Sequence, residues 1–433
     1  MSFTAAFKNR PFLSGLAAFT AGAFVLGFVP LMQGHSEMHQ MDGHMTGAHI
    51  GGDHAKMHAE HMAQIRAGDG ETAAPETLED WGALVFMDAN LSANRTMSCA
   101  TCHSPEAAFT DPRETDAGRA VSMGDDGASL GDRNTPTAAY AALSPKFGRD
   151  AKGQWHGGQF HDGRAATLAE QAGGPPLNPI EMGMPSKAAV VERLNEDATH
   201  RAALLKFNGI SDPIADPIAD PDASFEAMTQ ALAAFETSKM FAPFDSKYDR
   251  YLAGEVKLTD LEETGRVLFF ANQFTNCVQC HQLNEFGGAA NEPFTNYTFH
   301  NIGTPANTAA RGFNGVTLPD EGLAMTTGDP ADRGKFKTPT LRNIAVTGPY
   351  MHNGVFADLR TVILFYDKYN SKNPARQINP ETGAPWAAPE IPGTLSMVEL
   401  ESGPGLADNR VDALVAFLKT LTDARYEALL ADQ

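Results

Sequence analysis

The chain has 433 residues, 42% of them hydrophobic, and carries a formal net charge of -20. This length suits two domains of ordinary size with extensions, and the apolar content is sufficient for buried cores. The negative charge argues against binding to nucleic acid and to an anionic membrane surface. It favours a basic protein partner, although solubility alone also explains it.

Residues 1–32 have the features of a targeting segment. Lys8 and Arg10 precede an apolar run from about Phe12 to Met32 that no acidic residue interrupts. The run is long for a signal peptide and long enough for a membrane-spanning helix, and no clear cleavage site follows it. A signal peptide and an N-terminal anchor are therefore both consistent with the sequence. Either one predicts that the rest of the chain is exported to the periplasm.

Residues 33–74 predict a disordered arm. Seven His and six Met lie between Met32 and Met62, among Gly, Asp and Gln and without apolar periodicity. Thioether and imidazole groups are ligands for copper, and imidazole also binds zinc. The arm is therefore either a metal-binding segment, with copper as the candidate ion, or a solvated tether.

Two copies of the pattern Cys-x-x-Cys-His stand out in the remaining sequence, at Cys99–His103 and Cys277–His281, and they contain all four cysteines of the chain. In this pattern both thiols form thioethers with a haem, and the adjacent His is the proximal ligand of the iron. A thioredoxin-like redox pair or half of a zinc site would not explain the His that follows each copy. We therefore predict two covalently bound haems c, held by Cys99, Cys102, His103, Cys277, Cys280 and His281.

Similar segments precede the two motifs, which indicates an internal duplication. Trp81–Phe86 and Thr264–Phe269 each have a short amphipathic helical pattern. Thr259 and Glu262 have the spacing of a capping box before the second of these helices. Each helix then leads into a loop that bears a haem motif.

The boundary between the two halves is predicted soon after a helix at Phe225–Thr237. The stretch Asp212–Pro221 repeats Asp-Pro and predicts turns, because each Pro blocks helix continuation. No run of alternating strands is found. The predicted fold is mainly α, with two tandem cytochrome c-like haem domains at residues 75–240 and 241–433.

The sequence closely resembles the bacterial di-haem cytochrome c peroxidase and MauG family from about residue 77 to residue 422. The resemblance lies in a series of short runs that occur in the family's order. These runs are Arg133–Thr137, Phe160–Ala165, Glu170–Ala172, Pro175–Pro176, Glu181–Gly183, Phe336–Asn343 and Pro349–Gly354.

The resemblance implies an open face on the first haem. Gln171 and Glu181 have the family's ten-residue spacing, and Pro175 matches the Pro that crowds the same face. A carboxylate with a pKa raised by an apolar pocket can move a proton between the two oxygens of peroxide, and the Gln amide can orient the oxidant. Considered alone, Glu181 would more often be a surface carboxylate.

On the second haem the resemblance implies an unusual iron ligand. In the cytochrome c peroxidases of the family this ligand is a Met, and the matching run Leu359–Tyr366 has Tyr366 there, as in the MauG branch. An anionic phenolate stabilises oxidised iron better than a thioether does. The alternative is that Tyr366 is a core aromatic, on one helix face with Val362 and Tyr369.

The family also has residues that this chain lacks. Resting peroxidases block the first iron with a His, and no His lies between Ala117 and Arg133, so that iron is expected to be open to peroxide; Met123 is the alternative ligand. Where the family has a Trp between the haems, this chain has His161. Because His is harder to oxidise than Trp, the electron route through this position is in question.

A calcium ion between the domains is also implied by the resemblance. Asn134, Thr347 and Pro349 match its ligands, and hard oxygen atoms suit calcium. Asn134 alone would more often be a turn residue. His352 lies in a family motif near the second haem, where packing or a hydrogen bond is its expected role.

The function that the resemblance implies is an exported di-haem enzyme. It would react with hydrogen peroxide, form a high-valent di-haem state and oxidise a partner, with aromatic side chains of another protein as the expected target. One alternative is a peroxidase that removes hydrogen peroxide and receives electrons from a small cytochrome or a cupredoxin. Another is a non-enzymatic electron carrier or copper-handling protein. A copper-binding protein is a further candidate partner, because of the His- and Met-rich arm.

Overall fold

The computed structural model describes residues 74–208, 216–313 and 315–432. The predicted targeting segment, nearly all of the arm and part of the Asp-Pro repeat lie outside these ranges. Within the described ranges, no helix is long and apolar enough to cross a membrane.

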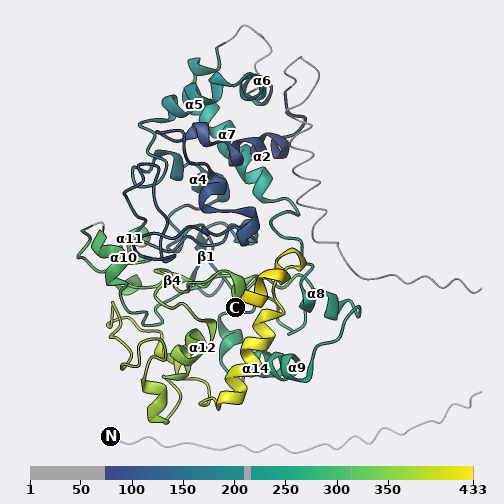
Figure 1. Cartoon of the computed structure of the whole chain (residues 1–433), viewed down its shortest axis with the longest axis vertical. Helices are drawn as coiled ribbons and strands as arrows, with labels where there is room; N and C mark the ends of the chain where they lie inside the picture. The colour runs from purple at the N-terminus through teal and green to yellow at the C-terminus, as the bar shows by residue number, and fades with distance from the viewer. Residues whose placement is uncertain (1–73, 209–215, 314, 433) are drawn as a thin grey trace, which may run out of the picture. The chain divides into compact units, whose positions relative to one another are not determined.

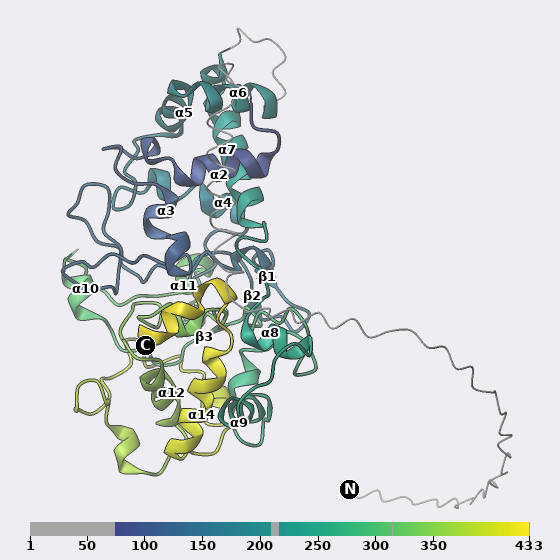
Figure 2. The same ribbon diagram turned by 45° about the vertical axis from the view of Figure 1, so that its right-hand side comes forward.

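The first half of the described chain is built around two crossing helices, α2 (Leu78–Met87) and α7 (Pro221–Glu236). Figures 1 and 2 show α2 lying across α7, with the shorter helices around them. The crossing is close because Gly82 has no side chain: a Cβ there would lie 1.9 Å from the carbonyl oxygen of Ala231. The other helices of this half are α3 (Cys99–Cys102), α4 (Leu168–Ala172), α5 (Lys187–Glu196) and α6 (Ala198–Phe207).

The second half repeats this arrangement with α9 (Asp260–Phe270) and α14 (Asp408–Lys419). Here a Cβ on Gly265 would lie 1.9 Å from the carbonyl oxygen of Ala413. The internal duplication predicted from the sequence therefore has a structural counterpart. The other helices are α8 (Lys247–Leu252), α10 (Thr308–Phe313), α11 (Ala324–Thr327), α12 (Leu359–Asp367) and α13 (Met397–Leu400).

Helix starts follow the predicted cap chemistry. The capping box of Thr259 and Glu262 begins α9, as predicted. An equivalent box of Thr77 and Asp80 begins α2, where Asp takes the place of the usual Glu or Gln. The helix predicted at Phe225–Thr237 is α7, and it begins earlier than predicted, at Pro221. A Pro is tolerated there because the first turn of a helix does not need its backbone N–H.

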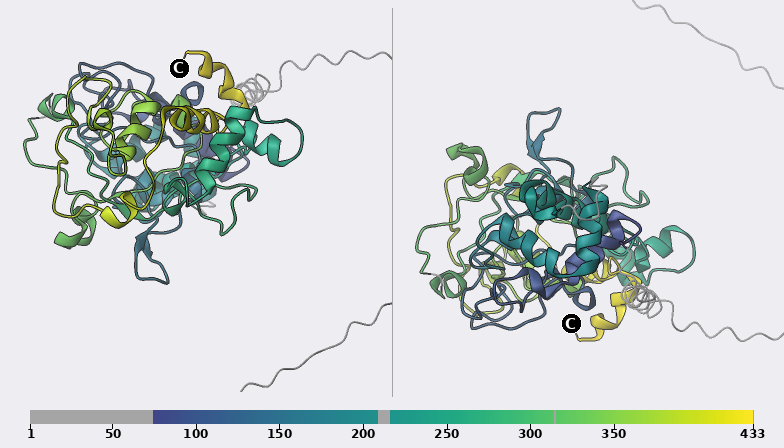
Figure 3. Two further views of the ribbon diagram at one scale, coloured as in Figure 1. Left: turned by 90° about the horizontal axis from the view of Figure 1, so that it is seen from below. Right: turned by 90° about the horizontal axis from the view of Figure 1, so that it is seen from above.

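Strands are few and short in the described residues. β1 (Gly148–Arg149) pairs antiparallel with β2 (Trp155–His156), and β3 (Phe299–His300) pairs antiparallel with β4 (Phe336–Lys337). The registers are Gly148 with His156 and Phe299 with Lys337. Figure 3 shows the β1–β2 hairpin standing out from the helices in both views. The mainly helical fold class is confirmed.

Two large apolar clusters lie in the described chain. One includes Trp81, Phe86 and Phe241, and the other includes Tyr248, Phe269 and Phe417. Each cluster contains one of the two glycine-mediated helix crossings. The exact limits 75–240 and 241–433 remain a prediction.

Candidate haem sites

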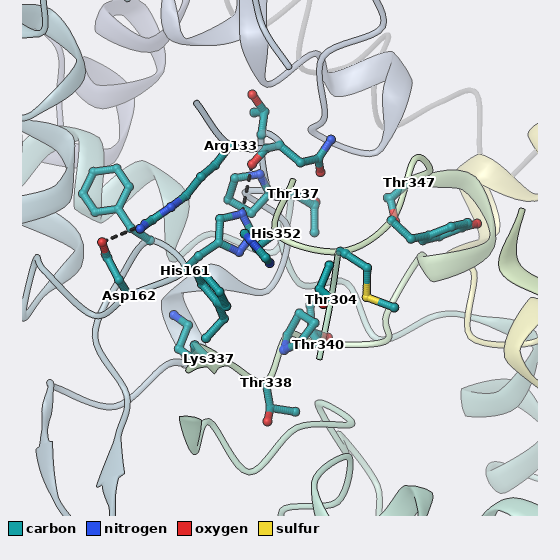
Figure 4. Close-up of a pocket in the computed structure, with 18 of the residues that line it drawn as sticks. Arg133, Thr137, His161, Asp162, Thr304, Lys337, Thr338, Thr340, Thr347 and His352 are labelled. Atoms are coloured by element: carbon teal, nitrogen blue, oxygen red, sulfur yellow. Dashed lines mark hydrogen bonds and ion pairs between the residues drawn. The ribbon is translucent and has the colours of Figure 1, made fainter. Parts of the chain in front are cut away.

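One cavity of about 1060 Å³ contains both cysteine motifs. It is lined by every site residue that the sequence predicted, from segments that lie far apart in the chain. These are Cys99, Cys102, His103, Asn134, Gln171, Pro175, Glu181, Cys277, Cys280, His281, Thr347, Pro349 and Tyr366. Figure 4 shows part of this cavity, where the two halves of the described chain meet.

The first motif forms the single turn α3 and ends at His103. His103 Nδ1 lies 3.2 Å from the carbonyl oxygen of Phe109, which leaves Nε2 available for a metal. Burial lowers the pKa of His103, so the imidazole is neutral, as an iron ligand must be. Burial also raises the pKa of the Cys99 and Cys102 thiols, which sit in the apolar surroundings that a porphyrin requires.

The second motif begins with the 3-10 turn Cys277–Gln279 and orients its His in the same way. His281 Nδ1 lies 3.1 Å from the carbonyl oxygen of Phe294, and burial lowers its pKa to about 4. Phe109 and Phe294 have φ values of 55° and 56°. Positive φ is uncommon for an aromatic residue, so its recurrence shows that both loops fold alike to present the carbonyl to the His.

Gln171, Pro175 and Glu181 come from consecutive pieces of the first half: α4, the 3-10 turn Pro175–Leu177, and the loop after it. Burial raises the pKa of Glu181, and the positive charge of Arg164 opposes this rise. The Glu181 charge in turn raises the pKa of both Cys99 and Cys102, so its carboxyl lies near the first motif. This half therefore holds a carboxyl group with a raised affinity for its proton. Met123, the alternative iron ligand, lines the same cavity.

Tyr366 lies in α12 on the side of the second motif. Burial raises the pKa of its hydroxyl, and the Cys280 and Cys277 thiols add to this rise. The adjacent Phe365 is fully buried and packs on Phe356, whereas Tyr366 lines the cavity. Val362, one turn earlier, lines the same cavity, so this position fits both an iron ligand and an aromatic that packs beside the haem, and ligation stays a prediction.

His161 lies where the two halves meet. Its Nε2 is 2.9 Å from the carbonyl oxygen of Asn134, and its own carbonyl accepts a hydrogen bond of 2.8 Å from the backbone N–H of Lys337 (Figure 4). Burial lowers the pKa of His161 to about 4, so the ring is neutral at physiological pH. The residue matched to the family's Trp thus lines the cavity and is fixed by hydrogen bonds to the backbone of both halves.

Arg133 forms ion pairs with two segments, and the sequence analysis predicted neither pairing. It pairs with Asp162 at 2.7 Å and with Asp320 at 2.7 Å. Near it, the ring of His352 stacks on Phe336 with 3.6 Å between centroids, which confirms a packing role for His352. Asp320 lies 187 residues from Arg133, and no sequence pattern marks the pairing.

The predicted calcium ligands lie partly together. Asn134 and Thr347 both line a second, small cavity of about 10 Å³ beside Asp111. The Asn134 amide donates to the carbonyl oxygen of Ala120 at 3.0 Å, so its side-chain oxygen is the atom left for a cation. In the described chain no three His, Cys, Asp or Glu residues gather as a metal site, so an ion here would depend on amide and carbonyl oxygens.

Glu236 was missed by the sequence analysis. It ends α7, lines the large cavity and is 7% exposed, and burial raises its pKa to about 8. The sequence signal would have been its helical phase: it follows Leu232 by one turn, and Leu232 also lines the cavity.

The residues present fit two c-type haems. Each motif supplies two unpaired thiols and one neutral, oriented imidazole, and both face one large cavity. When bound, the haems supply redox-active iron at two sites.

Comparison with known proteins gives the same result. The family description "Di-haem cytochrome c peroxidase" matches residues 76–257. The chain is 55% identical to the methylamine utilization protein MauG of Paracoccus denitrificans over 84% of this chain and 94% of that protein. Among solved structures, it matches the crystal structure of the di-haem peroxidase BthA of Burkholderia thailandensis with a TM-score of 0.70 and 33% sequence identity. The match covers 82% of this chain and 88% of the BthA chain. A MauG-like protein associated with microbial copper homeostasis is 31% identical over 82% of this chain and 91% of that one, with a TM-score of 0.59.

Proposed function

The chain belongs to the di-haem cytochrome c peroxidase and MauG family, and we propose that it uses hydrogen peroxide to oxidise aromatic side chains of a partner protein. Membership of the family makes it an oxidoreductase with two c-type haems. The identity of the partner and the roles of individual residues are the proposed part.

The observation that carries this proposal is the unlike chemistry of the two halves of the cavity. Glu181 lies near the first cysteine pair, with its proton affinity raised by burial. Tyr366 lies near the second pair and offers a phenol oxygen. An electron carrier would need neither a proton-transferring group at one haem nor an anionic ligand at the other.

In this proposal each residue has a defined task. The Gln171 amide orients peroxide, Pro175 restricts the space beside it, and the Glu181 carboxyl moves a proton from one peroxide oxygen to the other. The Tyr366 oxygen would bind the second iron as phenolate, and the iron's charge would offset the cost of losing the phenol proton. His103 and His281 would also ligate the irons, and each ring is oriented by a backbone carbonyl.

A calcium ion and an exported location complete the proposal. Asn134, Thr347 and Pro349 would bind the ion through oxygen atoms, and the N-terminal segment would direct the chain to the periplasm. The His- and Met-rich arm would bind copper. Candidate partners are a copper-binding protein, a small cytochrome and a cupredoxin.

The second candidate is a peroxidase that only removes hydrogen peroxide. The chain is also 29% identical to the cytochrome c551 peroxidase of Nitrosomonas europaea over 68% of this chain and 74% of that protein. Such an enzyme needs a small electron donor and leaves no modified protein behind.

The two candidates are separated by spectra of the purified ferric protein before and after one equivalent of hydrogen peroxide. We expect one high-spin and one low-spin EPR signal, both lost for minutes after peroxide is added. Incubation with a partner should then restore the signals and leave oxidised Trp or Tyr in its mass spectrum. Two low-spin haems that react with peroxide only after prior reduction would overturn the proposal and favour the peroxidase.

A further inference from the structure

Glu236 is a buried acid that the proposed function does not use. It lies at the C-terminal end of α7, is 7% exposed and lines the haem cavity. No hydrogen bond or ion pair of its carboxyl group is found within residues 74–208, 216–313 and 315–432. An acid is rarely buried without a partner, because an unpaired buried charge is costly.

The duplication shows that a carboxyl is not needed here for folding. A Cβ on Gly82 would meet Ala231 and Phe235, and one on Gly265 would meet Ala413 and Phe417, at the same distances. The residue after Phe235 therefore corresponds to the residue after Phe417, which is Leu418. Leu418 is also 7% exposed and also lines the cavity. The second half fills this place with an apolar side chain, as hydrophobic packing requires.

No charged group of the described residues forms an ion pair with Glu236. Burial raises its pKa to about 8 and is the sole cause of the rise, although α2, α4 and α5 all pack on α7. Its charge raises the pKa of the Cys99 thiol, which becomes an uncharged thioether when haem is attached. Elsewhere in the cavity, the charge of Arg164 acts on the pKa of Glu181, and neither residue is a cause of the raised pKa of Glu236.

We propose that Glu236 is a proton-coupling residue of the haem bound at Cys99 and Cys102: its carboxyl holds a proton while that haem is reduced and releases the proton when the haem loses an electron. One electron and one proton leave together, so the charge inside the buried site stays constant. The inference depends on haem attachment to the first motif and not on the reaction with peroxide or the identity of the partner.

The physical reason is the charge of the iron. Oxidation adds one positive charge to the haem, and a nearby positive charge favours the ionised form of an acid. Because the cavity is apolar, this interaction is strong. Ionised Glu236 then stabilises the oxidised haem, while the protonated form avoids a buried negative charge when the haem is reduced. The apolar Leu418 cannot do this, so the coupling is specific to the first half.

The test is the reduction potential of each haem as a function of pH, measured by optical redox titration of the full-length protein with both haems attached. Between about pH 6 and pH 10 we expect the potential of the first haem to fall by up to about 59 mV per pH unit, the value for one proton per electron. E236Q keeps the shape and removes the titration, and E236L introduces the residue of the second half. Both variants should flatten this dependence.

Two further measurements control the result. L418Q places a neutral polar group at the duplicated position and should leave the slope of the first haem unchanged. The infrared difference spectrum of the wild type, reduced minus oxidised, should contain the C=O band of a protonated carboxylic acid, absent from E236Q. Equal slopes in the wild type and E236Q, or a wild-type spectrum without that band, would overturn the inference. Haem content of each preparation separates these outcomes from loss of the cofactor.

Discussion

The two halves of the described chain share one framework and differ where the haems would meet their ligands. Each half has a glycine-mediated helix crossing, at Gly82 and at Gly265, and each fixes its motif His with the carbonyl of a Phe that has positive φ. The side chains that line the cavity differ between the two halves. The framework thus places each cysteine motif, and the proposal assigns the different tasks of the two sites to residues of the lining.

In the proposed mechanism the first half serves proton transfer and the second half holds positive charge. The first half contains half-buried Glu181 and buried Glu236, two acids whose pKa values are raised by burial. In the second half the equivalent of Glu236 is Leu418, and Tyr366 lines the cavity beside the cysteines.

The largest expected effect is that of Tyr366→Phe. Removing the phenol oxygen should leave the second haem without its sixth ligand, turn it from low-spin to high-spin, and abolish oxidation of the partner while the first haem still binds peroxide. EPR of the ferric protein and partner oxidation by mass spectrometry measure both effects. Tyr369→Phe is the matched control, since Tyr369 lies in the same region but donates its hydroxyl to the Ile302 carbonyl at 3.0 Å. A low-spin second haem in Tyr366→Phe would contradict the assigned ligand.

Next in size is Glu181→Gln, which tests the first half alone. We expect the rate of reaction with peroxide to fall by about 10²–10⁴-fold, the usual contribution of a proton-transferring side chain, with the spin state of both ferric haems unchanged. Stopped-flow absorbance gives this rate. Glu170→Gln is the control, because Glu170 is exposed and near in sequence but does not line the cavity. An unchanged rate would remove Glu181 from the proposed mechanism.

The structural features that could be predicted from the sequence depend on residues close to one another along the chain. The two cysteine motifs, the helices that precede them and the helix bearing Tyr366 all depend on short-range patterns, and each is found where predicted. The resemblance to a family added residues such as Gln171 and Asn134, whose spacing alone carries little information. All of these residues line one cavity.

The features that could not be predicted depend on long-range packing. The pairing of Arg133 with Asp320 joins two loops, and neither loop has a periodic pattern that fixes its path. The position of Glu236 follows from the crossing of α7 with α2, so its carboxyl could not be placed in the cavity before that crossing was known. The capping box at Thr77 was overlooked because Asp80 is shorter than the usual Glu.

The shared framework is tested by Gly82→Ala and Gly265→Ala. In each variant the new Cβ would lie 1.9 Å from a carbonyl oxygen of the partner helix, so the helices must separate. We expect a loss of about 2–5 kcal/mol in unfolding free energy in both cases, in the range of severe core changes. Denaturant titration of the haem-loaded protein measures it. Gly312→Ala in α10 meets nothing within 4 Å and should be neutral or stabilising. A large loss at one crossing only would show that the two are not equivalent.

The smallest expected effect comes from removing a threonine hydroxyl whose hydrogen bonds are repeated in the two halves. The Thr137 hydroxyl donates to the Ala108 carbonyl at 2.6 Å and accepts from the Ala139 N–H at 3.0 Å. The Thr340 hydroxyl donates to the Pro293 carbonyl at 2.7 Å and accepts from the Arg342 N–H at 3.1 Å. Each hydroxyl thus holds the residue just before the Phe whose carbonyl orients a motif His.

Thr→Val at either position keeps the shape and removes both bonds, so each variant should lose about 1–3 kcal/mol in unfolding free energy. Thr→Ser keeps the hydroxyl and should recover most of the loss. Because the loop also orients the imidazole, the Val variants should broaden the EPR signal of their own haem and leave the other haem's signal unchanged. If Thr137→Val disturbs both haems, the two halves are coupled through these loops and do not behave as independent copies.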